Sequence, residues 1–360
     1  MVLAGCASDE PVPVRSMMSP TQAKALIARA LPASVSDRPG WATDIYAGLS
    51  AIQVAMTVPN VCAVIAIVEQ ESSFRANPSV PGLATIAWRE IDAKAQRAGV
   101  PSLVVRAALR LPSPDGRSYG DRIDAATTEK ELSDVFEDFI GMVPLGRRFF
   151  SDANPVRTAG PMQVSIAYAQ SHVGTRPYPY PGADNIRREV FTRRGGLYFG
   201  IAHLLDYPAA YDRPLYRFAD FNAGHYASRN AAFQNAVSIA SGVPMALDGD
   251  LIAHGAVSGA PIGATEAAVR VIGGRIGHGP DAIRTALEQG KSQQFSRTAL
   301  FARVFELADQ VEGRPVPRAL VPRIQLKSPK ITRELTTDWF AQRVDERHQR
   351  CMRRAADTNS

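Results

Sequence analysis

The stretch that most constrains the fold runs from Pro59 to Pro78. Eight consecutive apolar residues, Val61 to Val68, lead directly into the polar run Glu69-Gln70-Glu71-Ser72-Ser73. Periodicity alone does not decide whether such a run is a buried strand or a buried helix. We favour a helix, because Pro59 suits a first helical turn and no turn residue interrupts the passage into the polar end. A helix that is apolar on every side must be surrounded by others, so the sequence predicts a central core helix.

Glu71 is the residue of chemical interest at the end of this predicted helix. At helical spacing it lies above Ile67 and Val68, so its carboxyl sits where the apolar surface ends. Partial burial disfavours the charged form of a carboxyl and raises its pKa, as a general acid working near neutral pH requires. The plain alternative is a solvated glutamate at a helix end, and Glu71 alone does not decide between the two.

The composition describes a folded, basic protein. With 360 residues, 45% of them hydrophobic, the chain can bury the core of one large domain or two smaller ones. Its net charge of +6 suits an acidic polymer such as nucleic acid, anionic lipid or cell-wall material. No Lys/Arg run is interleaved with aromatic residues, so we expect no nucleic-acid partner. The three cysteines form no CxxC or Cys/His cluster, and we predict neither a metal nor a cofactor.

The N-terminal sequence Leu3-Ala4-Gly5-Cys6 resembles a bacterial lipobox, in which the cysteine carries the lipid anchor. Only five residues precede Cys6, too few for a leader, so either the start lies further upstream or the match is chance. If it is real, we expect an envelope lipoprotein, and Ala7 favours the outer membrane, facing the periplasm. In that oxidising compartment Cys62 and Cys351 can form a disulfide; two buried free thiols are the open alternative.

The rest of the chain predicts a mainly α protein with few strand signals and no repeat. We divide it into a tether (1–18), a main helical domain (19–250) with a helical insertion (79–157), and a C-terminal helical extension (251–360) packed on that domain. Further helices are predicted at 21–32, 39–54, 83–98, 102–111, 128–140, 165–173, 185–207, 215–224, 228–241, 264–272, 280–289, 295–312 and 331–354, with a polar turn at 112–121.

Three segments, in this order, resemble the soluble lytic transglycosylase and goose-type lysozyme superfamily. Glu71-Ser72 matches the Glu-Ser signature of that family, and Gly160-Pro161-Met162-Gln163 looks like its Gly-Leu-Met-Gln segment. Phe221-Asn222-Ala223-Gly224 is similar to its Tyr-Asn-Ala-Gly segment, and Asn185-Ile186 resembles a weaker landmark. Each match is weak alone, and the three together are fairly specific. They cover about a third of the chain and imply a lysozyme-like helical core.

The resemblance implies cleavage of the β-1,4 bond between N-acetylmuramic acid and N-acetylglucosamine in peptidoglycan glycan strands, leaving 1,6-anhydromuramoyl ends. Glu71 would be the acid and base, and Ser72 would orient it or the substrate. The remaining implied substrate-binding residues are Gly160, Met162 and Gln163 in the groove floor, and Phe221 and Asn222 beside the carboxyl and the sugar. Asp152 and Asp220 border two of the segments, but a surface or helix-flanking role is the simpler reading of each, so a single-carboxylate mechanism fits better than a two-carboxylate one.

Two departures from the family pattern keep an alternative open. Pro161 stands where the family has Leu and offers no backbone N–H, and Phe221 stands where Tyr is common and lacks its hydroxyl. Tyr168 or Tyr226 are candidates to supply that hydroxyl, and His225 is a further candidate to contact substrate. The alternative is a non-catalytic envelope lipoprotein that uses the same fold to bind glycan or a partner protein. A third reading, an unrelated helical protein with chance motifs, predicts that Glu71, Gln163 and Asn222 do not share one cleft.

Overall fold

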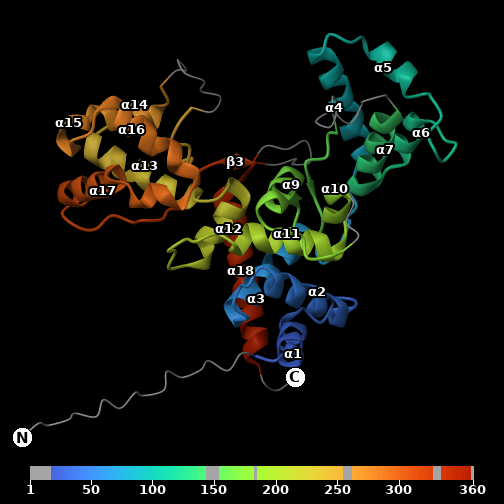
Figure 1. The fold of residues 1–360 in the computed structure, drawn as a ribbon, viewed down its shortest axis with the longest axis horizontal. Helices are drawn as coiled ribbons and strands as arrows, with labels where there is room; N and C mark the ends of the chain where they lie inside the picture. The colour runs from blue at the N-terminus through green and yellow to red at the C-terminus, as the bar shows by residue number, and fades with distance from the viewer. Residues whose placement is uncertain (1–17, 143–153, 182–184, 254–261, 327–333, 358–360) are drawn as a thin grey trace, which may run out of the picture.

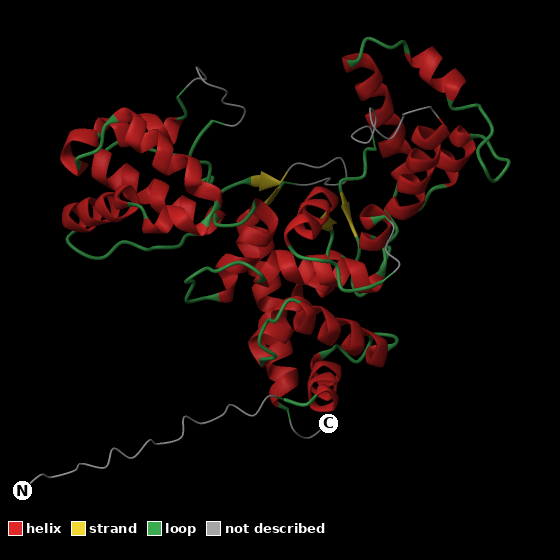
Figure 2. Ribbon diagram, viewed as in Figure 1, coloured by secondary structure: helices red, strands yellow, loops and turns green. Residues whose placement is uncertain are grey.

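The computed structural model describes residues 18–142, 154–181, 185–253, 262–326 and 334–357, so Cys6 and Asp152 lie outside the described residues. Over the described residues the protein is mainly α-helical, as predicted (Figures 1 and 2). The strands form two antiparallel pairs: β1 (Thr158–Ala159) with β2 (Val164–Ser165), and β3 (Gln325–Leu326) with β4 (Leu335–Thr336). Within these residues, no helix combines the length and the apolar character that crossing a bilayer requires.

The apolar run of the sequence forms the helix α3 (Val58–Glu71), which confirms the choice of helix over strand. The Thr57 side chain caps its start by accepting a hydrogen bond of 3.4 Å from the Asn60 backbone N–H. All residues from Val61 to Val68 are buried, so the helix has no solvent-facing side over two turns. It packs against α1 (Pro20–Ala30), α11 (Arg193–Leu205) and α18 (Thr337–Ala356).

The last helix of the chain, α18, returns to the core and lies along α3 (Figure 1). A disulfide joins Cys62 of α3 to Cys351 of α18, across 289 residues of sequence, which settles the pairing that the sequence left open. At the start of α3, the Pro59 carbonyl lies 3.2 Å from His348 Nε2. At its end, Glu69 accepts a hydrogen bond of 3.3 Å from the Arg350 guanidinium.

Among the described residues the buried apolar side chains gather into two cores, and the first core also includes side chains of the insertion (79–157). The central lobe contains α1, α2, α3, α9 to α12 and α18, and the second lobe contains α13 to α17 (Figure 1). α13, which precedes residue 250, packs with the second core, and α18, which follows it, packs with the first. The bounds not yet given are α2 (Arg38–Ala51), α9 (Ile166–Thr175), α10 (Ile186–Val190), α12 (Pro214–Ala223), α13 (Ala227–Ser241), α14 (Ala264–Val271), α15 (Gly273–Ile276), α16 (Pro280–Leu287), η2 (Glu288–Lys291), η3 (Gln293–Arg297) and α17 (Ala299–Glu312).

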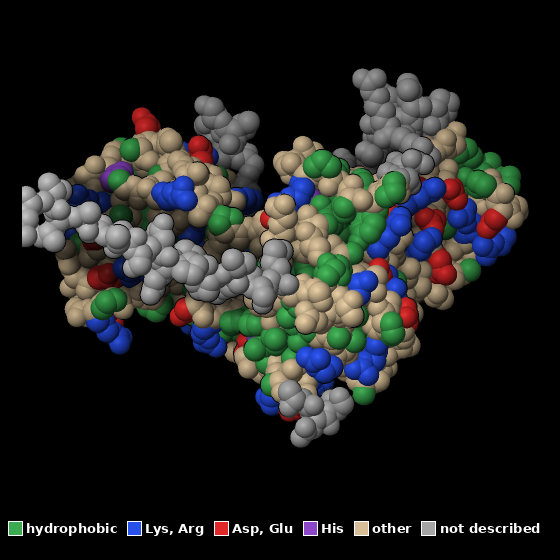
Figure 3. Space-filling view, turned by 60° about the horizontal axis from the view of Figure 1, so that its bottom comes forward, with side chains coloured by type: hydrophobic (Ala, Val, Ile, Leu, Met, Phe, Trp, Pro, Cys, Tyr) green, Lys and Arg blue, Asp and Glu red, His purple; other side chains and the backbone are tan. Residues whose placement is uncertain are grey.

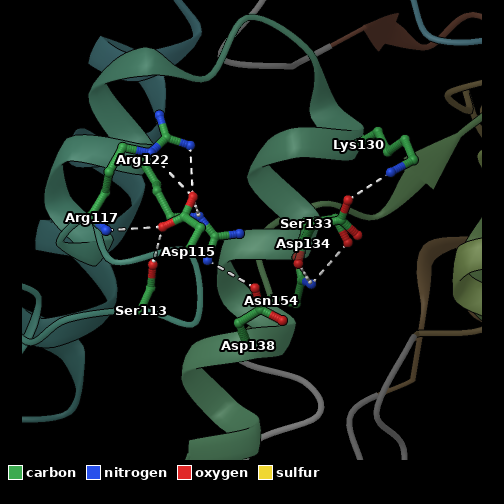
Figure 4. A network of polar contacts seen from close by, with 9 residues as sticks. All are labelled: Ser113, Asp115, Arg117, Arg122, Lys130, Ser133, Asp134, Asp138 and Asn154. Atoms are coloured by element: carbon green, nitrogen blue, oxygen red, sulfur yellow. Dashed lines mark hydrogen bonds and ion pairs between the residues drawn. The ribbon is translucent and has the colours of Figure 1, made fainter.

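In the residues that the structure describes, the insertion forms a third lobe that contains α4 (Leu83–Arg97), α5 (Ser102–Ala108), α6 (Tyr119–Ala125) and α7 (Glu129–Met142). α6 lies partly in the stretch expected to be a polar turn, because the Ser118 hydroxyl caps a short helix there. A polar network fixes the loop before α6 and ties α6 to α7 (Figure 4). In it Asp115 accepts from Arg117 at 2.8 Å, and Arg122 pairs with Asp138 at 2.8 Å.

The largest differences between predicted and observed helix bounds occur in two stretches. The stretch 185–207 breaks at Phe191 and Thr192, where the Thr192 hydroxyl accepts from the Gly195 N–H at 3.0 Å and starts a new helix, α11. The final helix begins at Thr337, after β4. On the face drawn in Figure 3, basic side chains lie on all three lobes, so the positive charge is distributed rather than gathered in one patch.

The disulfide gives a direct stability prediction. Replacing both Cys62 and Cys351 by Ala should lower the free energy of unfolding by about 2–5 kcal/mol, because the unfolded chain gains freedom when a long covalent loop is opened. Urea unfolding followed by circular dichroism measures this, with Cys6→Ser as the control for loss of a thiol elsewhere. An unchanged midpoint in the double variant, or two reactive thiols from Cys62 and Cys351 in unreduced, denatured protein, would contradict the bond.

Candidate active site

The first predicted segment lies at the carboxyl end of α3, where the chain turns sharply. Glu71 is the last helical residue and is partly buried, while Ser72 is buried and its hydroxyl donates to the Val68 carbonyl at 3.0 Å. Ser73 and Phe74 then adopt φ values of 48° and 60°. Two successive non-glycine residues in the left-handed region are costly, and such conformations concentrate at functional sites. The turn that follows Glu71 is therefore held by its surroundings.

The other glutamate at this helix end has a different environment. Glu69 pairs with Arg350 and lies 3.7 Å from Arg347, both on α18. Residues two apart on a helix are about 200° apart around its axis. Because Glu69 faces α18, Glu71 faces away from it, toward the side of α3 that the last helix leaves uncovered.

The second segment forms the tight connection of the β1–β2 hairpin. Gly160 has φ of 75° and Gln163 has φ of 48°, and the Gln163 N–H donates to the Gly160 carbonyl at 3.0 Å. The Gln163 amide is held on both sides: its oxygen accepts from the Thr158 hydroxyl at 3.1 Å, and its nitrogen donates to the Gly160 carbonyl at 3.3 Å. Gln163 is thus a partly exposed side chain with a fixed orientation.

The rest of this hairpin packs on glycines of α11. A Cβ on Gly160 would collide with the Val190 carbonyl oxygen and approach the Gly196 Cα to 2.9 Å. Met162 is fully buried, and a Cβ on Gly200 would meet its side chain at 2.5 Å. Gly160 and Met162 were expected to line the groove floor, but both are buried and present no surface to a sugar. Their role is to seat the hairpin on α11 and so to position Gln163.

The third segment ends α12. Asn222 is exposed, and its side-chain oxygen accepts from the Thr337 hydroxyl of α18 at 3.2 Å. Phe221 is partly buried, and its carbonyl lies 3.2 Å from His203 Nε2 on α11. Gly224 ends the helix with φ of 106°, and Tyr226 follows with φ of 67°. This segment therefore contacts both α11 and α18.

A ring cluster supports Phe221 from within. The His203 ring lies 5.1 Å from the Phe221 ring, 4.6 Å from the Tyr168 ring and 4.5 Å from the His225 ring. Burial lowers the pKa of His203 to about 4, so the imidazole is neutral at neutral pH and a protonated Nε2 can donate to the Phe221 carbonyl. Of the candidate hydroxyls, Tyr168 belongs to this cluster, whereas Tyr226 is buried with its ring 4.3 Å from the Arg229 guanidinium.

Asp220 has a structural role. Its carboxylate is fully buried and accepts four hydrogen bonds, from the hydroxyls of Tyr207 (3.1 Å) and Tyr211 (2.7 Å) and from the backbone N–H groups of Tyr226 (2.9 Å) and Ser228 (2.7 Å). It therefore holds the turn between α12 and α13 and is not available to a substrate.

A cavity of about 440 Å³ lies beside Phe74, three residues after Glu71. Trp41 packs edge to face on Phe74 at 5.3 Å, and the Arg193 guanidinium lies 5.3 Å from the Trp41 ring. Arg193 also pairs with Asp37 at 2.7 Å and with Asp44 at 2.5 Å. We did not predict this cavity from the sequence. The feature that could have indicated it is the Arg193-Arg194 pair, which precedes Gly195-Gly196 at the start of a buried helix.

α11 connects the three predicted segments. It contacts α3, whose end carries Glu71, the hairpin that carries Gln163, and α12, which ends at the Phe221–Gly224 segment. Non-glycine residues with positive φ occur in the described residues at Asp37, Gln53, Ser73, Phe74, Gln163 and Tyr226. Four of these six lie in or within three residues of the three segments. Each of the three segments therefore lies at a strained turn, and the elements that carry them all contact α11.

The close packing of the hairpin predicts a strong effect of a small substitution. Gly160→Ala should lower the free energy of unfolding by about 1–3 kcal/mol, because the new Cβ meets backbone atoms that have little freedom to move. Gly174→Ala, in α9 with open space around the added carbon, is the matched control and should not destabilise the protein. Thermal unfolding of both variants measures the difference. Equal midpoints would contradict the packing described here.

Comparison with known proteins gives the family of the chain. Residues 34–354 match the family described as "Protein of unknown function (DUF1615)". The chain is similar to "Uncharacterized protein YaiW" of Escherichia coli (strain K12), with 52% identity over 353 residues, which are 98% of this chain and 96% of the relative. No solved structure matches it significantly. The chain therefore belongs to the DUF1615 family.

Proposed function

We propose that this protein binds the glycan strands of peptidoglycan and cleaves the bond between N-acetylmuramic acid and N-acetylglucosamine, in the manner of a lytic transglycosylase with a lysozyme-like core. The observation that carries the proposal is the position of Glu71: it is the partly buried last residue of a helix whose Val61–Val68 stretch is buried on every side, and it is turned away from α18. The two other segments that resemble the transglycosylase superfamily contact the same helix, α11, as α3 does.

The proposed chemistry needs one carboxyl. Glu71 in its acid form donates a proton to the glycosidic oxygen as the bond to the muramoyl anomeric carbon breaks. The resulting carboxylate then accepts the proton of the muramoyl 6-hydroxyl while that oxygen bonds to the anomeric carbon. The products are a 1,6-anhydromuramoyl end and a free 4-hydroxyl on the departing sugar, and Glu71 regains its proton. Positioned proton transfer of this kind contributes about 10²–10⁴-fold in rate.

Two features support this single-carboxylate chemistry over hydrolysis by a carboxylate pair. The buried Asp220 carboxylate already accepts four hydrogen bonds, and Asp37 and Asp44 by the nearby cavity are paired with Arg193. A second catalytic carboxylate must reach the sugar from a defined distance, either as nucleophile or as base for water. Asp220, Asp37 and Asp44 already have these partners, so none of them is a good candidate for a second catalytic carboxylate.

The amides of Gln163 and Asn222 supply the proposed sugar contacts. Each is held by a threonine hydroxyl, Thr158 for Gln163 and Thr337 for Asn222, so little side-chain freedom is lost when a ligand binds. Preorganised amides suit the N-acetyl and hydroxyl groups of a glycan. Buried Gly160 and Met162 contribute by fixing the hairpin rather than by contact.

We further propose that the protein works in the cell envelope. The Cys62–Cys351 disulfide supports this, because disulfides persist in oxidising compartments. A lipid anchor on Cys6 in the outer membrane, facing the periplasm, follows from the lipobox-like sequence.

The second candidate function is glycan binding without cleavage. Phe221 favours it. Its ring packs on His203, and it stands where members of the transglycosylase superfamily commonly have a tyrosine, whose hydroxyl would lie near the carboxyl. Pro161 favours it too, because it has no N–H for a substrate.

Digestion of purified sacculi separates the two functions. Wild-type protein should release anhydro-muropeptides detectable by mass spectrometry, and Glu71→Gln should reduce their yield at least 100-fold, because an amide is too weakly acidic to protonate the glycosidic oxygen. Glu69→Gln is the matched control: it changes the same helix two residues away, at a side chain that faces α18, and should keep most of the activity.

Binding of the same proteins to sacculi, measured by co-sedimentation, completes the experiment. Binding by wild-type protein without any released product would reject cleavage in favour of the second candidate. Loss of activity in Glu69→Gln equal to that in Glu71→Gln would show a structural effect of the helix end rather than the proposed proton transfer.

A further inference from the structure

The tip of the insertion lobe carries an apolar surface that the fold leaves uncovered. α5 has no buried residue, and its Leu103 and Val104 are 82% and 58% exposed. Leu111 after the helix is 46% exposed and Val100 before it is 38% exposed. These four residues, which we call the α5 tip, lie on one short stretch of chain. Large apolar side chains so exposed and so close together mark an interaction surface.

The outward direction of the α5 tip is fixed by contacts on its other side. Arg106 stacks over the Trp88 ring at 4.6 Å and pairs with Asp92 at 2.9 Å, and both of these residues belong to α4. Leu109 is buried just after the helix. α5 is therefore seated on α4 through one face, and Leu103 and Val104 project from the helix away from the protein.

Along the sequence, the charged residues that flank the α5 tip are all basic. Between Asp92 and Asp115 the sequence contains no acidic residue, but it contains Lys94, Arg97, Arg106 and Arg110. Arg97 and Arg110 are exposed, and Arg110 lies two residues after the end of α5. An apolar ridge flanked by cations fits a surface that offers hydrocarbon beneath negative charge.

We propose that the α5 tip docks the insertion lobe on an anionic lipid surface. Leu103 and Val104 enter the boundary between headgroups and acyl chains, and Arg97 and Arg110 contact lipid phosphates. The tip protrudes at the outer edge of the lobe, as Figure 1 shows for α5. A protruding ridge suits a deformable bilayer, whereas a helix-binding partner protein would have to supply a matching acidic groove.

This contact is independent of glycan cleavage and of a lipid on Cys6. α5 lies in the insertion lobe, and α1, the first helix after the tether, lies at the opposite end of the molecule (Figure 1). The proposal is therefore tested on the full chain with Cys6→Ser, so that no covalent anchor contributes.

The test is co-sedimentation with sucrose-loaded vesicles of phosphatidylglycerol and phosphatidylcholine, compared with vesicles of phosphatidylcholine alone. The Cys6→Ser protein should bind the anionic vesicles at least tenfold more tightly, and binding should weaken as salt rises. Adding Leu103→Ser and Val104→Ser should reduce that binding about tenfold. Val271→Ser with Val311→Ser is the matched control, because these valines of the second lobe are 67% and 54% exposed but lie on separate helices.

A fluorescence readout locates the contact. Leu103→Trp should shift its emission to shorter wavelength on addition of anionic vesicles, and Val271→Trp should not. Equal binding to both vesicle types, or equal loss in both double variants, would overturn the proposal. A dimer that forms without lipid and is abolished by Leu103→Ser with Val104→Ser would overturn it too, in favour of a contact between two copies of the chain.

Discussion

The pairing of α3 with α18 is the constraint on which the central lobe depends. A helix that is apolar on every side over Val61–Val68 has to be covered on every side, and the chain supplies the last cover only from its final twenty helical residues. The Cys62–Cys351 disulfide makes that cover covalent. Because α3 and α18 come from opposite parts of the sequence and pack together in the central lobe, the insertion lobe and the second lobe are excursions of the chain between them.

The same pairing gives the two glutamates at the end of α3 different surroundings. α18 brings Arg347 and Arg350 to Glu69, and thereby neutralises the carboxylate that faces it. Glu71, on the other side of the helix, is left in the half-buried position that a general acid needs. α18 also brings Thr337 to Asn222, so a single C-terminal helix influences two of the three segments of the candidate site.

α11 has a comparable role from the opposite side. Its glycines allow the β1–β2 hairpin to approach at backbone contact distance, and its His203 supports the end of α12 as a neutral, partly buried imidazole. Neither the glycines nor His203 takes part in the proposed proton transfer. They fix the position of the site, because a hairpin packed on Gly196 and Gly200 has little room to shift and catalytic geometry tolerates little displacement.

Much of this could be predicted from the sequence where local signals are strong. The long apolar run identified α3, and periodicity identified most of the other helices. The hairpin strands were missed because they are only two residues long, and α6 was missed because its polar sequence forms a helix through the Ser118 cap. Periodicity carries no information about contacts between distant segments. Such contacts determine that α13 packs in the second lobe, that Met162 is buried, and that a cavity forms at Trp41, Phe74 and Arg193.

The central claim is that Glu71, Gln163 and Asn222 serve one glycan site, and a crystal structure of the Glu71→Gln protein with a bound muramic acid-containing tetrasaccharide tests it most directly. We expect a glycosidic oxygen within hydrogen-bond distance of the side chain at position 71, with adjacent sugar rings contacting Gln163 and Asn222. A tetrasaccharide ordered elsewhere, for example in the cavity at Trp41 with position 71 untouched, would contradict it.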